Sequence, residues 1–155
     1  MASEMRLVEI GTVTRREGKT RVELREEYRK ALEGLSEFSH CHVLWWSGSD
    51  FGMGIDTRAI LGGELPYAPG HSSGVFANRS PFRPNLIAMT VCPILSVEVA
   101  SGFLELAAID ALEGTSVLDI KPYYGSCDRV RASKTPSWLP DWGEWFPEGG
   151  IGLED

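Results

Sequence analysis

The sequence predicts an all-β fold, most simply a closed or nearly closed barrel with one short helix. Several runs of the 155-residue chain are rich in apolar, strand-forming residues. One segment alone has the three- and four-residue apolar spacing of a helix. No helix-length segment separates the last strands, so crossover helices between parallel strands are excluded there. A chain of this length is most simply one domain.

The first half of the chain is expected to hold two strands, the helix and a buried strand. Alternation over residues 7–13 predicts the first strand, and residues 19–24 predict a short second one. Apolar residues recur at helical spacing over residues 24–35, where Gly34 is a helix-stop signal. The nearly continuous apolar run at residues 41–46 predicts a buried strand.

The second half begins with an expected long loop and then continues as strands. Residues 47–73 are rich in Gly, Ser, Pro and Asp, and loops of this length are often functional. A strand is expected to start within residues 74–78, and residues 86–99 form a long β-rich run. Pro93 inside that run predicts a bulge or an edge position. Two further strands are expected at residues 102–109 and 117–123.

Charge argues against a large nucleic-acid surface. The net charge is −7, whereas affinity for nucleic acid rests mainly on cations that meet phosphates. The charge is nevertheless uneven along the chain. Residues 121–134 carry four basic residues against Asp128 alone, and residues 141–155 carry five acidic residues and no basic one. A local basic patch beside Arg79 and Arg83 would form if the fold brings these segments together.

The cysteines and the apolar runs indicate a cytoplasmic protein. The three cysteines, Cys41, Cys92 and Cys127, are far apart and form no CxxC pair, which favours free thiols in a reducing compartment. No leader opens the sequence, and no apolar run reaches the ~18 residues of a membrane span. We therefore expect no membrane association.

Trp138, Trp142 and Trp145 lie within eight residues of one another near the C-terminus. Pro140 and Gly143 interrupt any helix there. Two interpretations stay open. The tail packs its aromatic rings onto the barrel or a partner subunit, or it forms a stacking platform for a nucleobase.

The sequence His40-Cys41-His42 resembles a metal-binding pattern. On a strand, His40 and His42 share one face and Cys41 points away. Two histidines are too few for a closed zinc site, and His71 is the third histidine of the chain. We expect strand-end histidines with hydrogen-bonded ring nitrogens, and no metal site. The glycine pairs at 52–54 and 62–63 lack the context of a phosphate-binding loop and are expected to form turns.

Two polar clusters are candidates for chemistry. Asp110, Glu113 and Asp119 fall near two strand edges, either as solvated hairpin acids or as an acidic rim that binds a cation, hydroxyls or amines. Alternation places Asp119 and Lys121 on one face of their strand. In the segment RSPFRPN, two prolines stiffen a loop that carries Arg79 and Arg83. These guanidinium groups suit a carboxylate, a phosphate or carbonyls, or they pair with the acidic rim.

Three segments carry a resemblance to a known family. GVFANRSPFRPNLIAMTV and AIDALEGTSVLDIKPY resemble the signature GVFATRSPFRPNPIGLSV and LDALDGTPVLDIKPY of the TsaA-like family, also called TrmO or VirR-like proteins. An aspartate follows that signature by a few residues and corresponds to Asp128. LEGLSEFSHCHVLWW is similar to the family's L-x-G-L-x-x-F-S-H-I-W-V-L segment. The resemblance covers approximately residues 6–130.

The resemblance implies a single-sheeted β-barrel that binds S-adenosylmethionine (SAM) and forms a homodimer with the cofactor near the subunit interface. We expect a TsaA-like SAM-binding barrel domain over residues 1–135, followed by an acidic Trp-rich tail over residues 136–155 in place of the C-terminal extension of some family members. The activity characterised in the family is methylation of the exocyclic nitrogen of threonylcarbamoyladenosine, beside the anticodon of certain tRNAs.

The family motifs also imply site residues. The positions that match cofactor-contacting segments are Gly48, Ser49, Arg83, Ile94, Asp110, Leu112, Glu113, Gly114 and Thr115. The positions expected to act on the acceptor are Arg79, Asp119, Lys121 and Tyr123. Among them, a carboxylate or tyrosine takes the proton and an arginine stabilises charge on a neighbouring carbonyl.

The sequence also departs from the family pattern. The family's PRQPG segment after the first strand is replaced by TRREGKTRVEL, and Asn78 stands in place of a threonine. SAM binding survives such changes more easily than tRNA specificity does. Three functions therefore stay open: a methyltransferase acting on a modified adenosine of tRNA, a methyltransferase of a small molecule or peptide, and a non-catalytic SAM-binding module.

Overall fold

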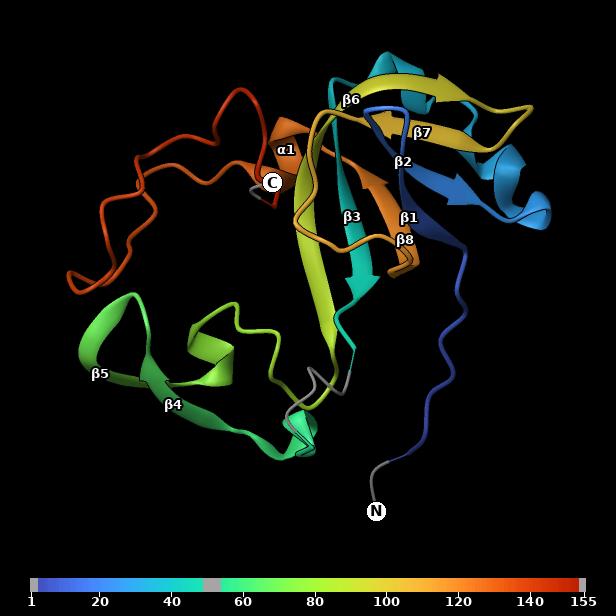
Figure 1. The fold of residues 1–155 in the computed structure, drawn as a ribbon. Coiled ribbons are helices and arrows are strands. Elements are labelled where there is room, and N and C mark those ends of the chain that lie inside the picture. The colour runs from blue at the N-terminus through green and yellow to red at the C-terminus, as the bar shows by residue number, and fades with distance from the viewer. Residues whose placement is uncertain (1–2, 49–53, 154–155) are drawn as a thin grey trace.

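The computed structural model describes residues 3–48 and 54–153. Its centre is a closed barrel of six antiparallel strands in the order β1-β2-β7-β6-β3-β8 (Figure 1). The barrel strands are β1 (Gly11–Arg16), β2 (Lys19–Leu24), β3 (His40–Trp46), β6 (Ile87–Glu98), β7 (Phe103–Leu106) and β8 (Ser116–Pro122). The single α-helix of the described residues, α1 (Gly125–Asp128), follows β8. The predicted all-β barrel with little helix is confirmed.

The barrel interior follows from strand alternation. Val13, Val22, Val43 and Leu104 come from four different strands and are completely buried. The apolar core continues with Leu24, Leu32, Leu35, Cys41, Cys92, Leu106, Ile109, Ala111 and Val117. His40 and His42 flank the buried Cys41, so they face outward as predicted.

The seam between β1 and β8 closes the barrel through a short pairing. Gly11 pairs with Val117, and the N–H of Ile10 donates to the Val117 carbonyl at 2.9 Å. A Cβ on Gly11 would lie 2.3 Å from the carbonyl oxygen of Glu23. Glycine is therefore required where β1 approaches β2 closely at the seam.

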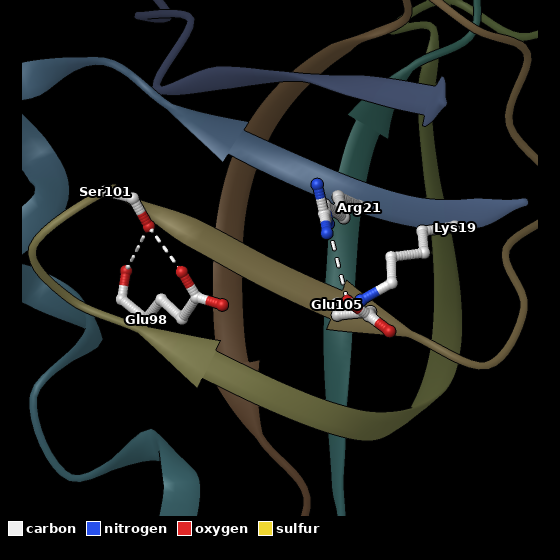
Figure 2. A network of polar contacts seen from close by, with 5 residues as sticks. All are labelled: Lys19, Arg21, Glu98, Ser101 and Glu105. Atoms are coloured by element: carbon white, nitrogen blue, oxygen red, sulfur yellow. Dashed lines mark hydrogen bonds and ion pairs between the residues drawn. The ribbon is translucent and has the colours of Figure 1, made fainter. Parts of the chain in front are cut away.

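A charged network braces the outer face of β2 against β7 (Figure 2). The Glu105 carboxylate accepts from Lys19 Nζ at 3.1 Å and from Arg21 Nε at 3.4 Å. Glu98, on β6, instead accepts from the Ser101 hydroxyl at 3.0 Å. These contacts lie on the side of the barrel that carries no family motif, so we assign them to stability.

Several element predictions were wrong in detail. The helical stripe over residues 24–35 forms two 3-10 helices, Glu26–Leu32 and Leu35–Glu37, which Gly34 separates with φ of 84°. The stripe still buries Leu32 and Leu35, because 3-10 and α-helices both bring residues three apart to the same side. The first strand begins at Gly11 rather than at residue 7. The expected strand within residues 74–78 is instead the 3-10 helix Val75–Ala77.

The segment predicted as a long loop contains a β-hairpin, β4 (Gly62–Leu65) and β5 (Ala68–Gly74), which lies apart from the barrel (Figure 1). The 3-10 helix Thr57–Ala59 precedes it. Pattern analysis missed the hairpin because Leu65 and Ala68 are its buried residues and most of the others are exposed. Across the described residues, every helix is too short to span a lipid bilayer.

The C-terminal tail packs its aromatic rings against the rest of the chain. The Trp142 ring meets Tyr67 edge-on at 5.1 Å, and Trp138 stacks on His71 at 5.7 Å. Phe146 meets His40 of the barrel at 6.0 Å. The packing interpretation of the tail thus agrees with the structure, although its main partner is the hairpin rather than the barrel wall.

Candidate functional site

The RSPFRPN loop is joined to the end of β3 at one end of the barrel. The Ser47 N–H donates to the Leu86 carbonyl at 2.9 Å, and the Ser47 hydroxyl donates to the Pro81 carbonyl at 3.3 Å. Gly48 follows with φ of 81°, a turn that glycine adopts without strain. Two segments that are far apart in the sequence, and that were both expected to hold the cofactor, therefore lie together.

The loop itself is held by a relay of side-chain contacts. Asn78 Oδ1 accepts from the Ser80 N–H at 2.9 Å, and Ser80 Oγ accepts from the Phe82 N–H at 3.1 Å. Arg83 Nη1 donates to the carbonyls of Ser80 at 3.0 Å and Asn78 at 3.4 Å. Both contacts use one nitrogen of Arg83, so its remaining N–H groups can serve another acceptor.

The two arginines of the loop have different surroundings. Arg83 is partly buried against its own loop, whereas Arg79 is exposed and makes no hydrogen bond or ion pair within residues 3–48 and 54–153. Neither arginine forms an ion pair with Asp110, Glu113 or Asp119 in that part of the chain. The hypothesis that they neutralise an acidic rim is therefore wrong.

Asp110 is anchored to the barrel wall instead. The Thr90 hydroxyl on β6 donates to Asp110 Oδ1, and the indole N–H of Trp45 donates to Thr90 Oγ1 at 3.0 Å. Arg15 Nη2 holds the same segment through the carbonyls of Ile109 at 3.0 Å and Ala111 at 2.6 Å. These contacts hold residues 109–111 against β6, the strand that follows the RSPFRPN loop.

The turn after residues 109–111 has an exposed backbone and an exposed apolar side chain. Gly114 has φ of 80°, and its N–H donates to the Val13 carbonyl at 2.8 Å. The Thr115 N–H closes the turn on the Leu112 carbonyl at 3.2 Å. Leu112 is 67% exposed, and Glu113 is exposed beside it. The turn therefore offers both a carboxylate and an apolar surface next to β1.

Ile94 does not join these residues. It lies seven residues beyond the start of β6, where its N–H donates to the Ser39 carbonyl at 2.8 Å. At roughly 3.3 Å per strand residue, about 23 Å of strand separates Ile94 from the Arg83 end. Ser49, another expected cofactor contact, lies outside the described residues.

Asp119 and Lys121 lie on the outer face of β8, and Tyr123 directly follows the end of that strand. Lys121 Nζ pairs with Asp119 Oδ2 at 2.8 Å, which confirms that the two share a face. The hydrogen bond and the charge of Asp119 raise the pKa of Lys121, so its amine stays protonated and acts as a cation rather than a base. The Tyr123 ring lies 5.6 Å from that of His42 on β3.

Sequence reasoning missed a hydrogen bond between His42 and Asp128. His42 Nε2 lies 3.0 Å from Asp128 Oδ1, and Asp128 Oδ2 accepts from the Tyr124 N–H at 3.0 Å. The pair attaches α1 to β3. His42 Nδ1 is buried with no hydrogen-bond partner in the described part of the chain, whereas His40 Nδ1 meets Ser39 Oγ at 2.8 Å. No group of three or more metal-ligating side chains occurs among the residues described.

A cavity of about 620 Å³ lies between the hairpin, the RSPFRPN loop and the tail. Sequence analysis placed Arg79 in the loop but had no signal that the hairpin and the tail would meet it. Its lining includes the side chains of Leu65, Tyr67, Arg79, Phe82, Leu139 and Trp142. Its volume is typical of small-molecule sites.

Comparison with known proteins gives consistent relatives. A family model for the tRNA-methyltransferase O N-terminal domain matches residues 10–129. A probable S-adenosyl-L-methionine-binding protein of Halobacterium salinarum is 35% identical over 101 residues, which cover 65% of this chain and 73% of the relative. A tRNA (adenine(37)-N6)-methyltransferase of Mus musculus is 37% identical over 98 residues, covering 63% of this chain and 21% of the relative.

Solved structures agree with the sequence relatives. A crystal structure of TrmO from P. aeruginosa aligns with a TM-score of 0.66 and 26% identity, and covers 92% of this chain and 66% of the solved one. A second TrmO crystal structure aligns with a TM-score of 0.65 and 29% identity, over 86% of this chain and 64% of the other. The chain thus spans just under two thirds of the length of these solved proteins.

Proposed function

Because the chain belongs to the family of tRNA-methyltransferase O N-terminal domains, we propose that it is a SAM-dependent methyltransferase. Its acceptor, in this proposal, is the exocyclic nitrogen of a modified adenosine in tRNA. The mammalian relatives carry the name of a tRNA adenine-37 N6-methyltransferase, and the archaeal ones that of SAM-binding proteins.

One arrangement carries the proposal. The segment after β3, the RSPFRPN loop and the turn at residues 110–115 are far apart in the sequence but gather on the same barrel strands. Ser47 ties the first two together, and the contact of Asp110 with Thr90 on β6 places the third over the same strands. A cofactor site built from three such segments explains why the family motifs lie in separate parts of the sequence.

The groups present at this end of the barrel suit SAM. Its adenine needs apolar contact and its ribose hydroxyls need an acceptor, while its carboxylate needs a cation. Leu112 supplies an exposed apolar side chain, Glu113 a carboxylate, and Arg83 the N–H groups that its own loop does not use. The backbone at Gly48 and Gly114 is open to close approach. These residues would hold the cofactor, which supplies a methyl group activated on a sulfonium.

The protein's own task is then to position the acceptor nitrogen and to remove its proton. A carbamoylated adenine nitrogen is a weak nucleophile, since its lone pair is delocalised. Holding it in line and excluding water supplies part of the acceleration. Arg79 stabilises negative charge on the neighbouring carbonyl, and a carboxylate or Tyr123 accepts the proton. Lys121, held protonated by Asp119, acts as a fixed positive charge.

A homodimer belongs to this proposal. Asp119 and Lys121 lie on the outer face of β8, whereas most of the expected cofactor residues lie at one barrel end. A second copy of the chain is the simplest way to bring an outer face to a barrel end. This arrangement also gives Ile94 a role across the interface, because its own barrel does not place it beside Arg83.

A second candidate is a methyltransferase of a small molecule or peptide. The net charge of −7 favours it, because an acidic surface repels RNA phosphates. In that case the same cofactor site serves a different acceptor.

Calorimetry with SAM tests the cofactor, and transfer of a radiolabelled methyl group to candidate acceptors tests the reaction. Heat of binding with transfer to an anticodon stem-loop that carries threonylcarbamoyladenosine supports the main proposal. Absence of heat at millimolar SAM, with folded protein, would refute it. SAM binding with transfer to small acceptors alone would favour the second candidate.

A further inference from the structure

The cavity between the hairpin, the loop and the tail has aromatic walls that come from separate segments. Tyr67 lies just before β5, Phe82 lies in the RSPFRPN loop, and Trp142 lies in the tail. The Tyr67 and Trp142 rings meet edge-on at an interplanar angle of 62°. An edge-on pair leaves ring faces open, and Trp142 stays 64% exposed despite this contact. Open aromatic faces at a cavity are suited to stacking on a planar ring.

The tail is a fixed wall of this cavity. Trp138 stacks on His71 with an interplanar angle of 25°, four residues before Trp142. Phe146, four residues after Trp142, meets His40 of the barrel edge-on at 6.0 Å. The position of Trp142 is therefore set by contacts on both sides of it.

The cavity has an unpaired positive charge. Arg79 lines it and makes no ion pair or hydrogen bond within the described part of the chain. Glu64 also lines the cavity, but within the described residues it forms no ion pair with Arg79, and its Oε1 accepts from the Gly70 N–H at 2.9 Å in the hairpin turn. An exposed guanidinium beside apolar walls favours an anionic group on the bound molecule.

From these three features we infer that the cavity binds one purine-sized aromatic ring that carries an anionic group, with the ring against Trp142 and the anion at Arg79. In the framework of the proposed function, on which this assignment rests, the occupant is the methyl acceptor. A carboxylated base within RNA and a free nucleotide share this chemistry. The tail then selects acceptors, since Leu139 and Trp142 form one side of the site.

Calorimetric titration tests the assignment with adenosine 5′-monophosphate, the nucleoside N6-threonylcarbamoyladenosine, and uncharged adenosine. Each titration is run with saturating S-adenosylhomocysteine, which occupies the cofactor site. We expect both anionic probes to bind more tightly than adenosine. The tighter of the two identifies the source of the anion, on the ribose or on the base.

Two pairs of variants locate the binding. Trp142→Ala should weaken every probe about tenfold, the loss expected for one stacking contact. Trp145→Ala, at a tail residue of similar exposure that does not line the cavity, should not weaken them. Arg79→Gln should weaken the anionic probes about tenfold and leave adenosine unchanged, while the exposed Arg16→Gln on β1 should not.

Three results would overturn the assignment. They are no binding of any probe at millimolar concentration, equal binding by Trp142→Ala and wild type, and binding that appears only in a parallel titration without S-adenosylhomocysteine. A separate SAM titration keeps the two ideas distinct. If SAM does not bind but the Trp142-dependent binding persists, the proposed function fails and the cavity stands as a nucleotide site.

Discussion

Arg79 and Arg83 show how two identical residues in one short loop take different tasks. Four positions apart, they share the same proline-stiffened backbone, yet Arg83 folds back on the carbonyls of Asn78 and Ser80 while Arg79 points to no partner in the described residues. The sequence predicts a loop that presents both guanidinium groups. Which of them braces the loop depends on the relay through Ser80, and the sequence pattern does not encode that choice.

Arg83→Ala should weaken SAM binding without unfolding the barrel. The variant removes the brace and a charged donor at the cofactor site, at a cost of about 1.5–3 kcal/mol for a hydrogen bond to a charged group. The strand ladders are untouched, so the melting temperature should stay close to that of the wild type. Calorimetry and thermal denaturation check this, with Arg16→Ala as the matched control. A large fall in melting temperature with normal SAM binding by the folded fraction would contradict it.

The three thiols should react at very different rates. Burial raises the pKa of Cys41 to about 12 and also raises that of Cys92, so neither forms thiolate at neutral pH. Cys127 is exposed on α1. Native protein treated with iodoacetamide should therefore carry one label, at Cys127, by peptide mass spectrometry, and Cys127→Ser should carry none. Unfolding in urea should release the other two sites. Rapid labelling of Cys41 in the native state would show that the barrel opens.

At the scale of elements, the charged network on β2 and β7 should make stability depend on pH. Hydrogen bonding to Lys19, with its charge and that of Arg21, lowers the pKa of Glu105 below its ordinary value. A carboxyl group with a lowered folded-state pKa stabilises the fold while it is ionised. This contribution is complete above the unfolded-state pKa, near 4, and is lost as the pH falls through the lowered value.

Glu105→Gln should therefore be less stable than the wild type at neutral pH, and the difference should shrink in acid. Urea denaturation at a series of pH values measures it. Glu98→Gln is the control on the neighbouring strand, where the carboxylate meets the Ser101 hydroxyl instead of cations (Figure 2). A Glu105→Gln difference that does not change with pH would show that the network does not contribute through charge.

Elements with a buried face were predictable and the others were not. β3 and β8 have strong apolar patterns, and the structure places both within a residue or two of the predicted bounds. The hairpin β4–β5 is mostly exposed and glycine-rich, so it gave no strand pattern. The same limit applies to the site. Motifs indicated the RSPFRPN loop, but the His42–Asp128 pair joins residues 86 positions apart and depends on how α1 returns to β3.

At the scale of the whole molecule, we expect a homodimer. Within the described residues, no hydrogen bond or ion pair joins Asp119 or Lys121 on β8 to the expected cofactor residues at the barrel end. Ile87, Met89 and Leu95 also leave apolar surface exposed along β6. Light scattering at micromolar concentrations should give twice the chain mass. A monomer mass throughout that range would contradict the expectation and would require one subunit to hold the complete site.

The identity of the methyl acceptor determines which charged residues of the molecule take part in binding it. If the acceptor is tRNA, phosphates must meet exposed basic residues of the RSPFRPN loop and of the segment 121–134. These are Arg79, Lys121, Arg129, Arg131 and Lys134. The tail lies against this basic surface, because the Arg129 guanidinium is 5.9 Å from the Trp145 ring. The acidic residues Glu144 and Glu148 of the tail are therefore close in sequence to a residue that contacts Arg129. The tail should therefore compete with RNA for the same patch.

Filter binding of an anticodon stem-loop at several salt concentrations tests this directly. Affinity should fall with salt by a log–log slope of about −0.7 to −0.9 for each phosphate contacted. Replacing Glu144 and Glu148 by glutamine should raise affinity at low salt, because it removes repulsion beside Arg129. The same replacement of Glu17, an exposed acid in the β1–β2 turn, is the control. If no RNA binds even at low salt while SAM does bind, the net negative charge of the protein repels RNA, and the acceptor is a small molecule or a peptide.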